Sequence, residues 1–93
     1  MADVAEQTLQ IINELGLHAR AATKLVQAAS KFPCDVTVSK DGHEVNGKSI
    51  MGVVMLAAGE GSKLKVTLEG HDAAQAMQEL DTLFESNRIF NED

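Results

Sequence analysis

The sequence predicts an α+β fold, a two-layer open-faced sandwich in which helices cover one face of a mostly antiparallel sheet. The chain has 93 residues, which suits one small domain over 1–93. Each strand-like segment alternates apolar with polar residues, so only one face of the sheet is expected to be buried. The patterns follow the order βαββαβα, and three helices must therefore pack against that single face.

The first strand and the first helix are predicted in the region before Pro33. Thr8–Asn13 predicts a short strand, because Leu9 and Ile11 alternate with polar residues. A turn centred on Gly16 follows, and Pro33 ends the helix that comes after it. Four apolar residues at the spacing of one helical face define that helix: Ala22, Leu25, Val26 and Ala29.

The middle of the chain predicts a hairpin followed by a short helix. Residues 35–39 alternate as a second strand, and an Asp-Gly turn at 41–42 leads into an edge strand around Val45. Ser49 can cap a helix that runs to about Met55, because its hydroxyl can accept an amide of the first turn.

The last strand and helix have the clearest patterns of the chain. Residues 63–69 alternate as a strand after a loop at 59–62. Asp72 and Gln75 offer a capping box for the third helix. The predicted buried face of this helix is Ala73, Ala76, Met77, Leu80, Leu83 and Phe84.

The net charge of −6 is unevenly distributed. Residues 15–50 hold five Lys or Arg and three acidic residues, a net charge of +2, whereas the rest holds three against eleven, a net charge of −8. An acidic chain binds nucleic acid poorly, because phosphates attract a basic surface. We therefore expect no nucleic-acid partner, but a locally basic segment within an acidic protein.

The single cysteine, Cys34, cannot form an internal disulfide, which favours a reducing compartment. No signal-peptide pattern opens the chain, and no apolar run reaches the length of a membrane span. We expect a cytoplasmic protein without membrane insertion.

His18 stands where the first helix is predicted to begin, and Arg20 follows two residues later. Backbone N–H groups are unpaired at that point and the helix dipole is positive, so the position attracts an anion, above all phosphate. The same field favours a neutral imidazole, which is a nucleophile. The pair therefore suits acceptance of a phosphoryl group, with Arg20 binding the phosphate oxygens. The competing interpretation is a histidine that merely caps the helix or lies on the surface.

Two stretches of the chain carry a family resemblance. GLHARAATKLVQAASKF contains His18 and Arg20, and GKSIMGVVMLAAGEGS contains Ser49. The first is similar to the active-site segment of the HPr family, the histidine-containing phosphocarriers of the bacterial phosphotransferase system. The second is similar to that family's second signature, around its regulatory serine.

The resemblance implies a fold, a reaction and partners. The fold is a four-stranded antiparallel sheet with three helices on one face, and the last strand lies between the first and second. His18 would be phosphorylated on Nδ1 by Enzyme I and would pass the group to an EIIA domain, with Arg20 near the phosphate. We expect a monomeric carrier, not an enzyme, that uses no cofactor.

The second helix is too apolar to be buried on every side. Six of the seven residues from 50 to 56 are apolar, so some must be exposed. Adaptable methionines near a functional site suggest a docking patch, and the alternative is that this area packs beneath the following loop. The family's docking surface on the first two helices favours the patch, with Met51 and Val54 in it. Lys24 and Lys48 are expected to steer acidic partner surfaces, chiefly through the association rate.

Ser49 also resembles the serine that HPr kinase/phosphorylase, an ATP-dependent enzyme, phosphorylates in many bacteria. A phosphate there would place a dianion inside the docking patch and repel partners. The alternative function is therefore a mainly regulatory binding module of the nitrogen-related branch. Leu15 before Gly16 is typical of that branch, whereas KSIMGV is typical of the sugar branch, so the branch stays open.

Three further residues bear on the function: Ala21, and the histidines His43 and His71. Ala21 stands where the family usually has proline, and we expect a modest change at the helix start without loss of phosphorylation. His43 and His71 invite a metal site with His18, but their spacing matches no compact ligand motif. We expect both to be surface residues and no metal to be bound.

Overall fold

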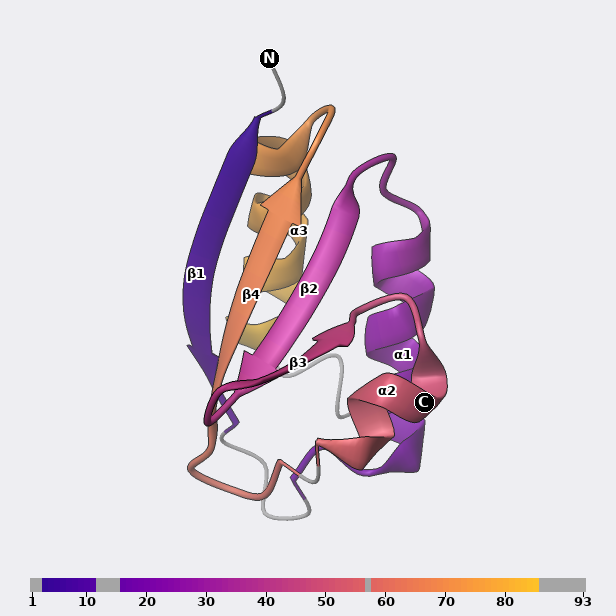
Figure 1. Cartoon of the computed structure of the whole chain (residues 1–93), viewed down its shortest axis with the longest axis vertical. Helices are drawn as coiled ribbons and strands as arrows, with labels where there is room; N and C mark the ends of the chain where they lie inside the picture. Colours follow the sequence, from indigo (N-terminus) through magenta and orange to yellow (C-terminus); the bar gives the residue numbers. More distant parts are fainter. Residues whose placement is uncertain (1–2, 12–15, 57, 86–93) are drawn as a thin grey trace.

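A computed structural model describes residues 3–11, 16–56 and 58–85 of the chain (Figure 1). The elements follow the order βαββαβα that the sequence predicts. Their bounds are β1 (Val4–Gln10), α1 (Ala19–Ser30), β2 (Asp35–Lys40), β3 (His43–Asn46), α2 (Ile50–Met55), β4 (Lys63–Glu69) and α3 (Ala73–Glu85).

The four strands form one antiparallel sheet in the order β1-β4-β2-β3. The last strand therefore lies between the first and the second, as the family resemblance implies. Buried side chains of neighbouring strands face each other: Val36 and Val38 of β2 are opposite Leu68 and Val66 of β4. These residues point to the same face, so the alternation in the sequence correctly predicts a one-sided sheet.

The helices close the buried face of the sheet. In Figure 1, α3 lies behind the strands and α1 lies to the right of β2, whereas α2 packs beside α1 and the short strand β3. Leu25 of α1, Leu64 of β4 and Leu80 of α3 are fully buried in one hydrophobic cluster. A fully buried leucine stabilises a fold by about 1.5–3 kcal/mol, so aliphatic residues supply most of this core, beside the buried Phe32 and Phe84. None of the described helices is long and apolar enough to cross a membrane.

The first strand differs from its predicted bounds. The sequence predicts Thr8–Asn13, whereas β1 begins at Val4 and ends at Gln10. The difference arises because β1 pairs with β4 along its whole length, from Val4 opposite Glu69 to Gln10 opposite Lys63. Val4 and its neighbours show no clear alternation, so only the partner strand fixes where β1 begins. The predicted end at 12–13 lies outside the described residues.

The capping box predicted for α3 is not formed by the described residues. Asp72 has a φ of 60°, and its carboxylate lies 3.3 Å from Nε2 of His71. An N-cap residue is normally extended, so a left-handed Asp72 directs its side chain away from the first turn. The predicted buried face of α3 is confirmed, although Leu83 is only partly buried.

Candidate functional site

The chain enters α1 through a close backbone contact with the loop after α2. Gly16 has a φ of 70°, a left-handed conformation that glycine adopts without strain. A Cβ at this position would lie 2.6 Å from the carbonyl oxygen of Ala58. The N–H of Leu17 donates to that same oxygen at 2.7 Å, and the Leu17 side chain is buried. These contacts fix the residue that follows, His18, in front of the helix.

His18 is the N-cap residue of α1. Its backbone is extended, with φ −73° and ψ 176°, and its carbonyl accepts the N–H of Ala22 at 2.8 Å. Its Nδ1 accepts the N–H of Ala21 at 3.3 Å. A backbone amide only donates, so Nδ1 presents a lone pair and not a proton. His18 therefore caps α1 through the same nitrogen that phosphoryl acceptance would use, so capping and phosphoryl acceptance do not exclude each other.

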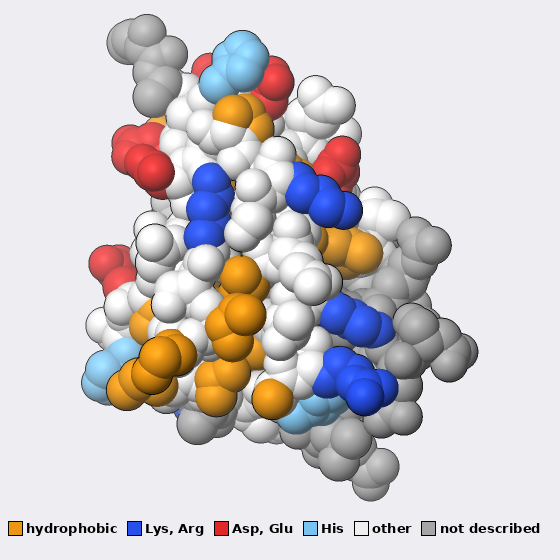
Figure 2. Space-filling model, turned by 90° about the vertical axis from the view of Figure 1, so that its right-hand side faces the viewer, with side chains coloured by type: hydrophobic (Ala, Val, Ile, Leu, Met, Phe, Trp, Pro, Cys, Tyr) orange, Lys and Arg blue, Asp and Glu red, His pale blue; other side chains and the backbone are white. Residues whose placement is uncertain are grey.

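Two cationic side chains follow His18 on α1. Arg20 is exposed and Lys24 is half-buried. They are four residues apart and therefore lie on the same side of the helix. Figure 2 shows Lys and Arg side chains beside a histidine and beside a group of apolar side chains on one face of the molecule. Such cations suit either phosphate oxygens or an acidic protein surface.

Four exposed apolar side chains form what we call the α2 patch. They are Ile50, Met51, Val54 and Met55, with exposed fractions of 46%, 76%, 40% and 77%. Only Val53 is buried within the helix, because one side of this short helix meets α1 and β3. Met51 and Val54, which the sequence assigns to a docking patch, are both among these exposed residues, and their part in docking stays a prediction. Ile50 and Met55 were not singled out, although the apolar run from 50 to 56 contained the signal.

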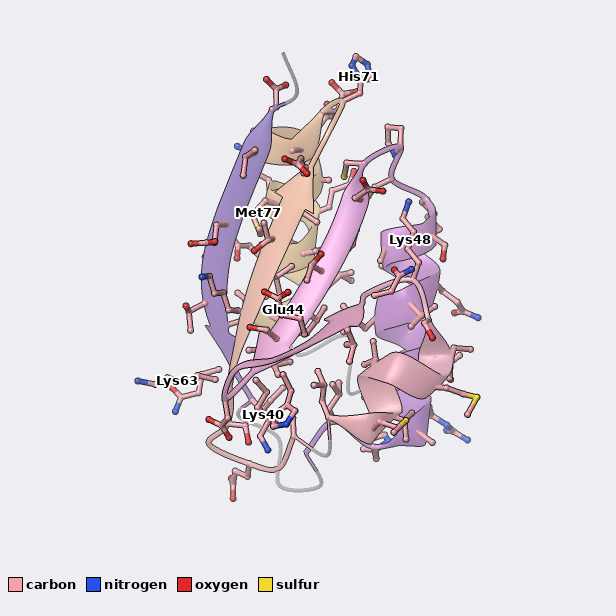
Figure 3. The ribbon with its side chains drawn as sticks, viewed as in Figure 1. Lys40, Glu44, Lys48, Lys63, His71 and Met77 are labelled. Carbon is pink, nitrogen blue, oxygen red and sulfur yellow. The ribbon has the colours of Figure 1, made fainter. Side chains whose placement is uncertain are left out.

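Lys48 is placed differently from Lys24. Its Nζ donates to the carbonyl of Phe32 at 2.8 Å, and Figure 3 shows the side chain beside α1. Its backbone N–H donates to Oδ1 of Asn46 at 2.8 Å. Lys48 thus joins the segment before α2 to the end of α1, where a cation is favourable for the helix dipole. The expectation that Lys48 steers acidic partner surfaces stays a prediction.

Ser49 is the N-cap residue of α2, as predicted. Its backbone is extended, with φ −111° and ψ 116°, and its Oγ accepts the N–H of Gly52 at 3.2 Å. The side chain is half-buried at the start of the helix that carries the α2 patch. A change of charge at this hydroxyl would therefore act directly on the patch.

The other two histidines lie apart from His18. His43 begins β3 and His71 follows β4, and both are exposed as predicted. Figure 3 shows His71 at the end of the sheet that is farther from α2. In the described part of the chain, no three His, Cys, Asp or Glu side chains gather as metal ligands. The thiol of Cys34 is buried, with 2% of the residue exposed.

Known proteins share both the sequence and the architecture. A family model described as "PTS HPr component phosphorylation site" matches residues 5–86. "Phosphocarrier protein HPr" of Xylella fastidiosa is 53% identical over 88 residues, which cover 95% of this chain and 97% of that protein. The protein of the same name from Neisseria meningitidis is 48% identical over 87 residues, which cover 94% and 96%. The crystal structure of HPr-C-His from Thermoanaerobacter tengcongensis is similar with a TM-score of 0.86 and 44% identity, covering 96% of this chain and 98% of that one.

Proposed function

The chain belongs to the HPr family, the phosphocarriers of the phosphotransferase system, and from this membership we propose that His18 carries the phosphoryl group on Nδ1. The observation that supports this assignment is the bond from the Ala21 N–H to Nδ1 at 3.3 Å, which leaves Nδ1 unprotonated at the positive end of α1. Phosphoryl transfer is mostly positioning and charge stabilisation. The protein therefore acts as a relay for partner enzymes and needs no catalytic machinery of its own.

The transfer step needs a phosphorylated donor and an acceptor. We assign the donor to Enzyme I and the acceptor to an EIIA domain. The Nδ1 lone pair of His18 forms a bond to phosphorus while the bond to the donor breaks, and that electron pair stays with the donor. The guanidinium of Arg20 is placed in the first turn, where it can offset the charge of the phosphoryl oxygens.

The partners dock on the α2 patch and on the neighbouring part of α1. The exposed Met51 and Val54 supply apolar contact area, and methionine adapts to more than one partner surface. Lys24 adds positive charge on the adjacent helix, which acts mainly on the association rate. A carrier must leave each partner, so we expect brief and weak complexes.

A second candidate function is a mainly regulatory binding module, and the place of Ser49 favours it. Its hydroxyl caps the helix that bears the α2 patch. Phosphorylation by an HPr kinase/phosphorylase would add about two negative charges there and weaken docking. In this case partner binding would depend on Ser49 and not on His18.

The test is phosphorylation with phosphoenolpyruvate and Enzyme I. We expect a label that is lost in acid and survives in base, that disappears in His18→Ala, and that is unchanged in the matched control His71→Ala. Subsequent transfer to an EIIA domain identifies the acceptor. A label that persists in His18→Ala would refute the assignment, and an acid-stable label lost in Ser49→Ala would support the regulatory function.

A further inference from the structure

The hydrogen bond between Ala21 and His18 has a consequence for the transfer itself. We propose that the Ala21 N–H is a positioning group that changes acceptor during the reaction, from Nδ1 in the free carrier to a phosphoryl oxygen in the loaded carrier. The inference rests on the proposed function of His18 and extends it to a backbone group in the first turn of α1. Its basis is the 3.3 Å contact from the Ala21 nitrogen to Nδ1.

In the free carrier this amide decides which ring nitrogen holds the proton. The Ala21 N–H can only donate, so Nδ1 accepts and the imidazole proton is on Nε2. The contact also selects one orientation of the ring, with Nδ1 directed at the helix. The nucleophile is thus held in the correct tautomer before a donor arrives.

The same contact cannot persist once Nδ1 is phosphorylated. A phosphorus atom bonded along the Nδ1 lone pair would lie between two nitrogens that are only 3.3 Å apart. The amide side of this contact is rigid, because Ala21 is 0% exposed and the Ala22 N–H is bonded to the His18 carbonyl at 2.8 Å. The imidazole must therefore move away from the amide, and the new phosphoryl oxygens take the space beside it.

The exchange of acceptor favours the loaded state. A hydrogen bond to a charged oxygen is about twice as strong as one to a neutral acceptor, and the helix start stays capped throughout. In the step itself Nδ1 gains the bond to phosphorus, the donor keeps the electron pair of the broken bond, and the Nε2 proton is not needed at the reacting atom. The amide moves no proton and acts only as a donor.

Nitrogen and phosphorus NMR test the two states directly. In the free carrier we expect the His18 ring to carry its proton on Nε2. After phosphorylation by Enzyme I and phosphoenolpyruvate we expect a scalar coupling between the Ala21 amide nitrogen and the phosphorus of phosphohistidine. A loaded carrier without this coupling, in which the Ala21 amide proton also keeps its free-state shift, would overturn the inference.

Ala21→Pro removes the N–H at a position in the first helical turn that tolerates proline. Without the donor we expect the ratio of the Nδ1-protonated to the Nε2-protonated tautomer of His18 to rise about 2- to 10-fold. At a fixed ratio of phosphoenolpyruvate to pyruvate we expect the ratio of loaded to free carrier to fall roughly 5- to 10-fold. If Ala21→Pro and the unchanged protein have the same ratio of loaded to free carrier, the proposed exchange of acceptor is contradicted.

A second replacement removes the donor without a proline ring. L-lactic acid in place of Ala21 keeps the methyl group and substitutes an ester oxygen for N–H, and the chain can be assembled by ligation between Pro33 and Cys34. The matched control places lactic acid at Ala28, in the same helix but away from His18. We expect the Ala21 ester to reproduce the proline variant and the Ala28 ester to load like the unchanged protein. If His18 is not phosphorylated at all, the proposed function fails with this inference, whereas loading without an effect of either Ala21 replacement overturns this inference alone.

Discussion

Gly16 controls where the candidate nucleophile stands. Its φ of 70° turns the chain towards α1, and its missing Cβ lets the backbone approach the Ala58 carbonyl. The neighbouring Leu17 N–H then bonds that carbonyl at 2.7 Å. The position of His18 therefore depends on a residue that has no side chain and takes no part in the chemistry.

Gly16→Ala should be more destabilising than an alanine at another left-handed glycine. A left-handed conformation costs alanine about 1–2 kcal/mol, and forced contact in a packed region adds about 1–3 kcal/mol. Gly42 is the matched control, because its φ is 85° and a Cβ there would meet nothing within 4 Å. Urea unfolding should show a loss of about 2–5 kcal/mol for Gly16→Ala and about 1–2 kcal/mol for Gly42→Ala. Equal losses would mean that the contact with Ala58 does not constrain Gly16.

Local chemistry made some residue contacts predictable and left others hidden. The cap formed by Ser49 follows from its place directly before a helical pattern, so the sequence predicts it. The bond from Lys48 to Phe32 joins residues 16 apart, and only the packed arrangement of α1 and α2 brings them together. The Ala21 bond to Nδ1 was missed because histidine is an uncommon cap, although the two residues are three apart.

At the scale of elements, α2 combines weak local stability with a large exposed apolar surface. A helix of six residues is too short to be stable by itself, so its cap and its contacts must hold it. The hydroxyl of Ser49 supplies the cap, and Val53 supplies the buried contact. The four exposed side chains of the α2 patch then remain available for a partner.

Substitutions at Ser49 should separate capping from regulation. Ser49→Ala removes the cap and should lower the free energy of unfolding by about 0.5–2 kcal/mol. Ser49→Asp keeps a capping oxygen, so stability should stay within about 0.5 kcal/mol. When a partner covers the α2 patch, the new carboxylate of Ser49→Asp would lose its bound water, which costs free energy. The affinity for Enzyme I, measured by calorimetry, should therefore fall about 3- to 10-fold.

The control for this experiment is a negative charge elsewhere on the surface. Gln10→Glu adds one at the exposed end of β1, away from α2, and should leave affinity unchanged. If both acidic variants weaken binding equally, the effect belongs to net charge and the regulatory role of Ser49 is not supported.

Element bounds were predictable where a pattern was strong. The alternation in β4 and the apolar face of α1 are strict, and both elements form as predicted. The start of β1 was not predictable, because Val4 is exposed and its strand is defined by pairing with residues 53 or more positions away. Long-range pairing of this kind leaves little trace in the local sequence.

At the scale of the whole molecule, one-sided burial follows from the sequence but strand order does not. The alternation of every strand predicts a single buried face, which the structure confirms. Nothing in that alternation places β4 between β1 and β2, and this order was expected only from the family resemblance. The order matters for function, because it leaves β3 at an edge where α2 can pack beside α1.

The distribution of charge over the molecule should matter more for docking than the net charge. Lys24→Glu and Lys63→Glu each take the net charge from −6 to −8. Lys24 lies on α1 in the proposed docking surface, whereas Figure 3 shows Lys63 on the side of the molecule away from α1 and α2. The rate constant for association with Enzyme I, measured by stopped flow at low salt, should fall about 3- to 10-fold for Lys24→Glu and less than about twofold for Lys63→Glu. Because the Debye length falls to about 3 Å at 1 M salt, the difference should shrink as salt is added. Equal slowing in both variants would instead show that the partner responds to net charge and would remove Lys24 from the docking surface.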